Sequence, residues 1–181
     1  MAKLGIFVNV IANLKFEQKL NSIKRKVNRK EFMLQIGEQI KTLIQGDTRT
    51  GKGVADSGNG EGIRINLATL SPKYVAWKNK YKGKSFTPGR FFRSGNKSNL
   101  TLTGQMIDAI DVEAKESYVR VFVKDSPRSG YGKDHTNKEI ADFVARNGRP
   151  FMGLSQQNKL IIDREIERET RAIVRRELAR K

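Results

Sequence analysis

Two segments with apolar residues at helical spacing constrain the fold of this chain more than any other feature. The first spans residues 14–45 and carries two apolar stripes, separated by the basic run KRKVNRK, which marks a break or a change of exposed face. In the second, residues 155–181, Ser155 is the predicted N-cap, and Glu167–Arg171 and Glu177–Lys181 form i, i+4 pairs. The stripes are Phe16, Leu20, Ile23 and Val27, then Met33, Ile36, Ile40 and Leu43, and finally Ile162, Ile166, Ile173 and Leu178. The pattern predicts a long N-terminal helical region and a C-terminal amphipathic helix.

The remaining pattern indicates strands and one shorter helix. Residues 118–123 are typical of a strand, and a turn near KES (residues 115–117) predicts a hairpin with the segment before it. Residues 4–10 alternate as in a strand, although a first helical turn fits them as well. KEIADFVARNG predicts a helix with Ile140, Phe143 and Val144 on one face and Gly148 as its stop. A chain of 181 residues is expected to form a single domain.

The stretch GDTRTGKG, Gly46 to Gly53, matches most of a phosphate-binding loop but lacks two of its requirements. Such a loop needs Ser or Thr after the lysine to hold magnesium, and Gly53 stands there. It must also leave a buried strand and open a helix, whereas here a helical pattern precedes it and a Gly-, Ser- and Asn-rich segment follows. The sequence favours a helix end at Gly46 and a mobile Gly-rich loop over residues 46–62, without ATP binding.

The net charge of +17 is the strongest global feature of the chain. It indicates a polyanionic partner, namely nucleic acid, an acidic protein surface or anionic lipid; the alternative is a solvated basic face with no partner. The chain has no cysteine, which excludes disulfides and zinc–cysteine sites. The apolar residues 4–14 are too few to span a bilayer and lack a convincing signal-peptide cleavage site, so we expect them to belong to the fold.

Candidates for catalytic chemistry are few. The single histidine, His135, lies in a predicted loop, cannot build an HExxH zinc site, and has no G-x-S-x-G turn to serve. Asp108, Asp111 and Glu113 are close in sequence, but alternation along a strand would place only part of this set on one face. We therefore expect neither an enzyme nor a cofactor or metal site.

A stretch free of acidic residues runs from Gly62 to Ile107 and mixes Lys and Arg with aromatic residues. We interpret residues 63–99 as a basic, aromatic, extended arm. Such a mixture suits single-stranded nucleic acid, because cations bind phosphates and rings stack on bases; aromatic residues also anchor subunit interfaces, which we favour here. For Arg149, an internal salt bridge competes with a partner contact. The candidate interface residues are Lys73, Tyr74, Trp77, Lys78, Tyr81, Phe91, Phe92, Arg93 and Arg149.

Three stretches occur in a telling order: LSPKYVAWKNKYKG (residues 70–83), LTLTGQMIDAI (100–110) and IADFVARNGRPFMGLSQQN (140–158). Together they resemble the virion morphogenesis, or tail-completion, proteins of tailed bacteriophages. The signal lies in the ordered set, since no single motif is specific. The matching positions are Ser71, Pro72, Tyr74, Lys78, Leu102, Thr103, Gly104, Phe143, Gly148, Arg149, Pro150, Phe151, Gly153, Leu154 and Ser155.

The resemblance implies an α+β fold in which a small antiparallel sheet is packed by a long N-terminal helix and a C-terminal helix, with extended loops. It also implies a homo-oligomeric ring, a hexamer being favoured, in the head–tail neck of the virion. Such a ring joins the head connector or head-completion protein to the tail tube, with viral DNA in its lumen and without membrane or cofactor. The alternative is a freestanding basic nucleic-acid-binding protein, whose affinity for DNA would fall steeply with salt.

The turn NGRPFMGLS also makes physical sense by itself. Gly148 and Pro150 stop one helix, and Ser155 caps the next. We expect Phe151 and Leu154 to anchor the turn in the core.

Overall fold

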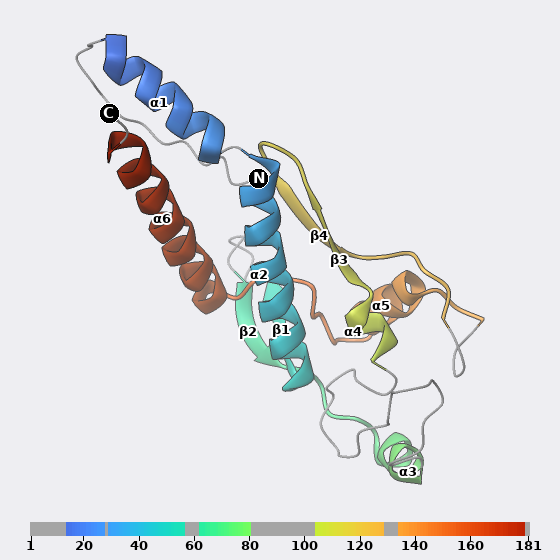
Figure 1. Ribbon diagram of the computed structural model, residues 1–181. Coiled ribbons are helices and arrows are strands. Elements are labelled where there is room, and N and C mark those ends of the chain that lie inside the picture. Colours follow the sequence, from blue (N-terminus) through green and yellow to red (C-terminus); the bar gives the residue numbers. More distant parts are fainter. Residues whose placement is uncertain (1–13, 28, 57–61, 81–103, 129–133, 180–181) are drawn as a thin grey trace.

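The computed structural model describes residues 14–27, 29–56, 62–80, 104–128 and 134–179, with the side chains of 14–20, 77 and 78 left out. The elements are α1 (Leu14–Val27), α2 (Lys30–Arg49), β1 (Lys52–Asp56), β2 (Gly62–Asn66), α3 (Pro72–Lys80), α4 (Gln105–Asp108), β3 (Ile110–Ala114), β4 (Val119–Val123), α5 (Asn137–Arg146) and α6 (Gln156–Ala179). Helix α2 is central, with α6 on one side and the β3–β4 hairpin on the other (Figure 1). The fold is α+β, as expected, and the antiparallel pairing in the described residues is divided between two two-stranded sheets.

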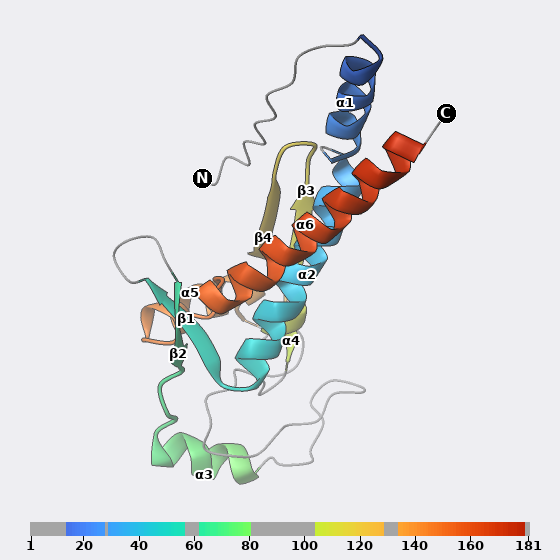
Figure 2. The same cartoon turned by 90° about the vertical axis from the view of Figure 1, so that its left-hand side faces the viewer.

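The basic run KRKVNRK does interrupt the N-terminal helical region. Helix α1 ends at Val27 and α2 begins at Lys30, and α1 then packs against α6 (Figures 1 and 2). The predicted stripes meet at this junction, because Val27, Phe32, Ile36 and Ile162 form one buried apolar cluster. The junction is therefore a small core of its own, built from all three long helices.

The C-terminal end of α6 departs from the sequence prediction. Leu178, expected on the apolar stripe, is half exposed, whereas Glu177 is only 6% exposed. The Glu177 carboxylate accepts hydrogen bonds from Lys26 Nζ and from Ser22 Oγ, the latter at 2.7 Å. We predicted an i, i+4 pair with Lys181, which lies outside the described residues. Within the described residues, the carboxylate ties α6 to α1.

The predicted hairpin after residue 104 is confirmed. Strands β3 and β4 pair from Ile110↔Val123 to Ala114↔Val119, and the Lys115 amide donates to the Tyr118 carbonyl across the turn at 2.9 Å. One face of this hairpin lies directly against α2 at Gly37. A Cβ atom at Gly37 would lie 2.3 Å from Val112 Cγ1 and 2.5 Å from Val119 Cγ2, so only glycine permits the contact.

The prediction of a mobile loop over residues 46–62 is wrong for most of its length. Helix α2 continues to Arg49, and residues 52–56 form β1, which pairs with β2 from Lys52↔Asn66 to Asp56↔Gly62. The glycines serve geometry rather than mobility. Gly51 turns the chain at φ 81°, and Gly53 lets β1 approach Pro150, whose carbonyl accepts from the Val54 amide at 3.0 Å. Residues 57–61 lie outside the described part.

The extended arm predicted over residues 63–99 is also partly wrong. Its first residues complete β2, and Pro72–Lys80 form the helix α3, while residues 81–99 lie outside the described part. Helix α3 begins with Ser71 and Pro72, and the Tyr74 amide donates to Ser71 Oγ at 3.3 Å. A serine cap followed by proline favours a helix start, since proline has the right φ and the serine oxygen satisfies a free amide.

The main core lies where α2, α4, α5, β3 and β4 meet, and the predicted turn inserts into it. Phe151 is 2% exposed and packs among Ile44, Met106, Ile107, Ile110, Val123 and Ala141. Leu154 packs on the same cluster. The expected burial of Phe151 is confirmed.

Both helix boundaries of this turn follow the sequence. Gly148 has φ 73°, a left-handed conformation that glycine adopts without strain, and Ser155 Oγ accepts from the Asn158 amide at 3.2 Å. Helix α5 starts with a capping box between Thr136 and Glu139. Its predicted apolar face is correct for Ile140 and Val144 but wrong for Phe143, which is 62% exposed.

Candidate assembly surfaces

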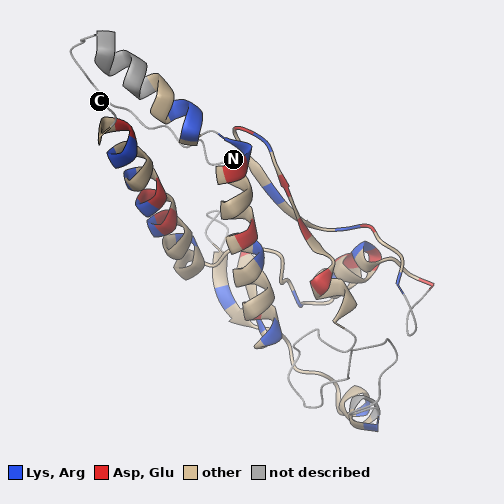
Figure 3. Ribbon diagram, viewed as in Figure 1, with Lys and Arg blue, Asp and Glu red and all other residues tan. Residues whose placement is uncertain are grey.

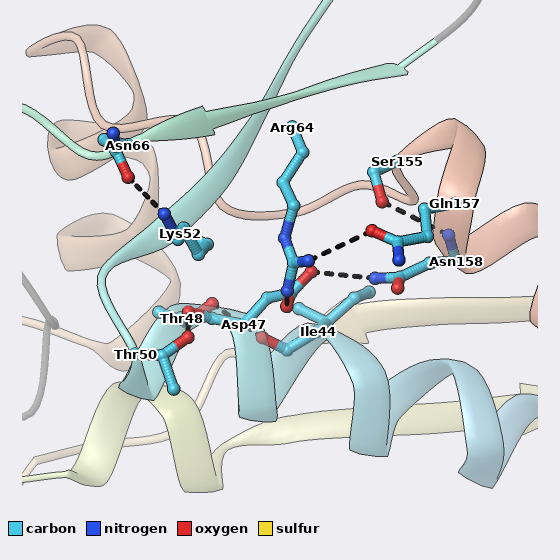
Figure 4. A network of polar contacts seen from close by, with 10 residues as sticks. All are labelled: Ile44, Asp47, Thr48, Thr50, Lys52, Arg64, Asn66, Ser155, Gln157 and Asn158. Carbon is cyan, nitrogen blue, oxygen red and sulfur yellow. Dashed lines mark hydrogen bonds and ion pairs between the residues drawn. The ribbon is translucent and has the colours of Figure 1, made fainter.

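The stretch Gly46–Gly53 has the wrong surroundings for a phosphate-binding loop. It joins the end of α2 to the start of β1, whereas a phosphate-binding loop joins a strand to a helix. Lys52 Nζ donates to Asn66 Oδ1 on the paired strand, and Thr50 Oγ1 donates to the Asp47 carbonyl at 2.8 Å (Figure 4). Both polar side chains thus hold the turn between helix and sheet.

A network around Asp47 connects three elements that are far apart in sequence (Figure 4). The Asp47 carboxylate forms an ion pair with Arg64 of β2 and accepts a hydrogen bond from Asn158 Nδ2 of α6 at 2.8 Å. Arg64 Nη1 also donates to Gln157 Oε1 at 3.2 Å. Arg64 belongs to the acid-free stretch, yet its guanidinium already has an internal carboxylate partner. Sequence reasoning missed this network, because its members lie 17 and 111 residues from Asp47.

Arg149 likewise makes internal contacts, and in the described residues these are hydrogen bonds to backbone carbonyls rather than a salt bridge. Its Nε and Nη2 atoms donate to the carbonyls of Ala68 and Thr69, each at 3.4 Å. These bonds join the turn after α5 to the segment between β2 and α3. The guanidinium is therefore a structural link in the described residues.

Apart from Arg149, the candidate interface residues that the structure describes lie on α3. This helix stands away from the rest of the described structure in both views (Figures 1 and 2). Lys73 is exposed, and Tyr74 is 36% exposed. Trp77 and Lys78 lie in α3, but their side chains are outside the described part, as are Tyr81, Phe91, Phe92 and Arg93 altogether. A short, weakly covered helix with a cation and an aromatic ring on its surface is suited to contact a neighbour.

The acidic candidates and the histidine do not converge. Asp108 forms an ion pair with Arg49 at 3.1 Å, and Glu113 lies opposite Arg120 in the β3–β4 register. Exposed His135 has its Nδ1 3.6 Å from Glu139. Within the described part of the chain, no three His, Asp or Glu side chains are grouped to hold a metal ion.

Two surface lysines show altered ionisation. A hydrogen bond to Tyr118 is the main factor that raises the pKa of Lys115, and a hydrogen bond to Asp142 is the main factor that raises the pKa of Lys138. Both lysines are exposed and far from α3 in sequence. The raised pKa values are a consequence of these local pairs and do not mark a reactive centre.

Two open grooves flank α6. One, of about 420 Å³, runs between α2 and α6 and has mainly apolar walls, including Leu43, Ile161 and Ile162. The other, of about 370 Å³, lies where α1 ends and α2 begins, and its wall contains Lys26, Arg29 and Arg176 beside Phe32 and Ile173. These grooves and α3 are the surfaces that offer most to a partner.

No family model, no curated protein and no solved structure matches the chain. Among the described residues, none of the helices is both long enough and apolar enough to cross a membrane.

Proposed function

We propose that this chain is a structural virion protein of the bacteriophage head–tail neck, of the tail-completion or tail-terminator type. It forms a homo-oligomeric ring, with a hexamer favoured, between the head connector and the tail tube, and DNA passes through the ring. The observation that carries this proposal is the α5–α6 turn, the longest segment of the family resemblance. There Gly148 adopts a left-handed conformation, Phe151 is buried in the main core, and Ser155 caps α6.

The surface of the protein supports a role in assembly. Each copy in a ring contacts two neighbours through different surfaces, so a ring subunit needs at least two contact regions. Helix α3 offers one, with Lys73 and Tyr74 exposed. Phe143 on α5 offers a second region, because its large apolar side chain is exposed on the surface.

Electron microscopy of particles tests the proposal directly. When the gene for this chain is inactivated in the phage that encodes it, filled heads and separate tails should accumulate, and plasmid-borne protein should restore joined particles. Phe143→Ser should fold like the wild type, because the phenyl side chain of Phe143 is exposed, yet the variant should restore head–tail joining poorly. Glu116→Ser, another exposed residue, serves as the matched control and should restore joining fully. Normal tailed particles in the absence of the chain would refute the neck assignment.

The freestanding nucleic-acid-binding protein remains the competing proposal, and its support is the charge of +17. In the described residues part of that charge is occupied internally, since Arg64 is paired with Asp47. A freestanding binder would be absent from purified particles and dispensable for head–tail joining. Mass spectrometry of purified virions separates the two proposals.

A further inference from the structure

A dense group of cations lies where α1 ends and α2 begins, close to the end of α6 (Figure 3). The chain turns there within a few residues, so side chains from both helices and from α6 come to one place. Helix α6 contributes Arg176, which shares the wall of the 370 Å³ groove with Lys26 and Arg29. We call this group the helix-junction patch. Its members are Lys24, Arg25, Lys26, Arg29, Lys30 and Arg176.

The six cations of the patch outnumber the three carboxylates in the groove wall, which are Glu31, Glu169 and Glu177. Glu177 is buried and paired with Lys26, and its carboxylate also accepts a hydrogen bond from Ser22 Oγ. Glu169 Oε1 lies 3.3 Å from Arg168 Nη2, and Arg168 is not part of the patch. Lys24, Arg25, Arg29 and Lys30 are all exposed. The patch therefore presents a concentrated positive field to the outside.

Two of these cations, Arg29 and Lys30, lie at positions that are unfavourable for the fold, whereas Lys24, Arg25 and Lys26 lie in the last turn of α1, where the helix dipole favours cations. Arg29 is the N-cap of α2 and makes no side-chain capping bond, and Lys30 is the first residue of the helix. Helix N-termini favour Asp, Ser, Thr or Asn and disfavour cations, because the helix dipole is positive there. Where a sequence breaks such a local rule without a structural gain, function is the usual reason.

We propose that the helix-junction patch binds the phosphodiester backbone of double-stranded nucleic acid. The duplex carries one negative charge per about 1.7 Å of its axis. A compact group of cations can therefore contact several phosphates of one duplex at once. The aromatic side chain in the groove wall, Phe32, is buried in the core and is not offered for base stacking. The contact is therefore to phosphates and is independent of base sequence.

A second copy of this chain is a poorer partner for the patch. The described acidic residues of β3 and α5 lie beside Lys and Arg, as in Glu113 opposite Arg120 of β4 and Lys138 beside Asp142 (Figure 3). Such mixed surfaces produce little net field. The proposal does not depend on the neck assignment, because duplex binding is measured on the isolated chain and head–tail joining on particles.

Two variants with equal loss of charge test the location. The patch variant changes Lys24, Arg25, Arg29 and Lys30 to Gln and keeps Lys26, whose removal would leave the buried Glu177 without its cation. The control variant changes the exposed residues Lys124, Arg164, Arg168 and Arg171 to Gln. Circular dichroism melts should show that both fold like the wild type.

Fluorescence anisotropy with a short labelled duplex of arbitrary sequence, titrated over a range of salt, gives the result. At low salt the patch variant should bind about tenfold more weakly or worse, and its slope of log K against log salt should shrink by about 0.9 per lost phosphate contact. The control should lose less than about threefold. Equal losses in both variants, or wild-type binding by the patch variant, would refute the patch. So would light scattering in which the patch variant loses self-association while its duplex binding is unchanged.

Discussion

The contact between α2 and the β3–β4 hairpin at Gly37 allows a sharp test of the fold. Gly37→Ala adds one methyl group only 2.3 Å from Val112 Cγ1 and 2.5 Å from Val119 Cγ2. Both neighbours are β-branched and have few alternative rotamers, so the helix or the hairpin has to move. Overpacking of this kind costs about 1–3 kcal/mol. Alanine gains about 1 kcal/mol of helix propensity, so we expect a net loss of about 0–2 kcal/mol in the free energy of unfolding.

Gly46 provides the matched control within the same helix. An added Cβ at Gly46 meets nothing within 4 Å, so Gly46→Ala should stabilise the protein by up to about 1 kcal/mol. Urea denaturation of the two variants and the wild type measures both effects, and about 1 kcal/mol corresponds to about 2–4 °C in Tm for a chain of this size.

The two substitutions should change the free energy of unfolding in opposite directions. If Gly37→Ala is stabilised as much as Gly46→Ala, the hairpin does not lie against α2 at this point. A double variant with Val112→Ala tests the contact itself. Its loss should be smaller than the sum of the two single losses, because the smaller side chain relieves the overlap.

Three further changes follow from the turn and the helix–strand junction. Phe151→Ala should lose about 3–5 kcal/mol, because it removes a fully buried ring from the main core, and an unchanged Tm would show that the turn is not part of that core. Gly148→Ala should lose about 1–2 kcal/mol from left-handed strain even though open space surrounds the site, while Gly148→Asn should lose less; equal melting temperatures for both would contradict this account. Isothermal titration calorimetry should detect no ATP binding. The free energy of unfolding of Lys52→Ala should lie within about 1 kcal/mol of the wild-type value, because the hydrogen bond from Lys52 to Asn66 is exposed. An ATPase activity that Lys52→Ala abolishes would overturn the interpretation of Gly46–Gly53.

Local patterns predicted the parts of the fold that depend on near neighbours in sequence. The β3–β4 hairpin, the left-handed Gly148 and the cap at Ser155 each require only a few adjacent residues. Of the two alternatives that the sequence left open for KRKVNRK, the structure has the break, after Val27. The burial of Phe151 also followed from its place between a helix stop and a helix cap.

The features that sequence reasoning missed depend on distant partners. The sequence does not distinguish a glycine in a flexible loop from a glycine that lets two backbone segments pack closely. Gly53 therefore suggested a mobile loop, whereas in the structure it lets β1 pack on Pro150. Phe143 has helical spacing with Ile140 but lies beyond the edge of the core that α5 faces. Asp47 is joined to Arg64 and Asn158 only after the chain has folded.

The division of the apolar interior into two clusters has a consequence for how the protein opens. Within the described part of the chain, the cluster at the α1–α2–α6 junction and the main core around Phe151 have one side chain in common, that of the partly buried Ile40. Regions joined by so little packing form separate cooperative units. Amide hydrogen exchange should therefore be faster in α1 than in β3, at denaturant concentrations where the protein as a whole is still native. Helix α1 can then leave α6 and return many times in the lifetime of one folded molecule, while the packing around Phe151 stays closed.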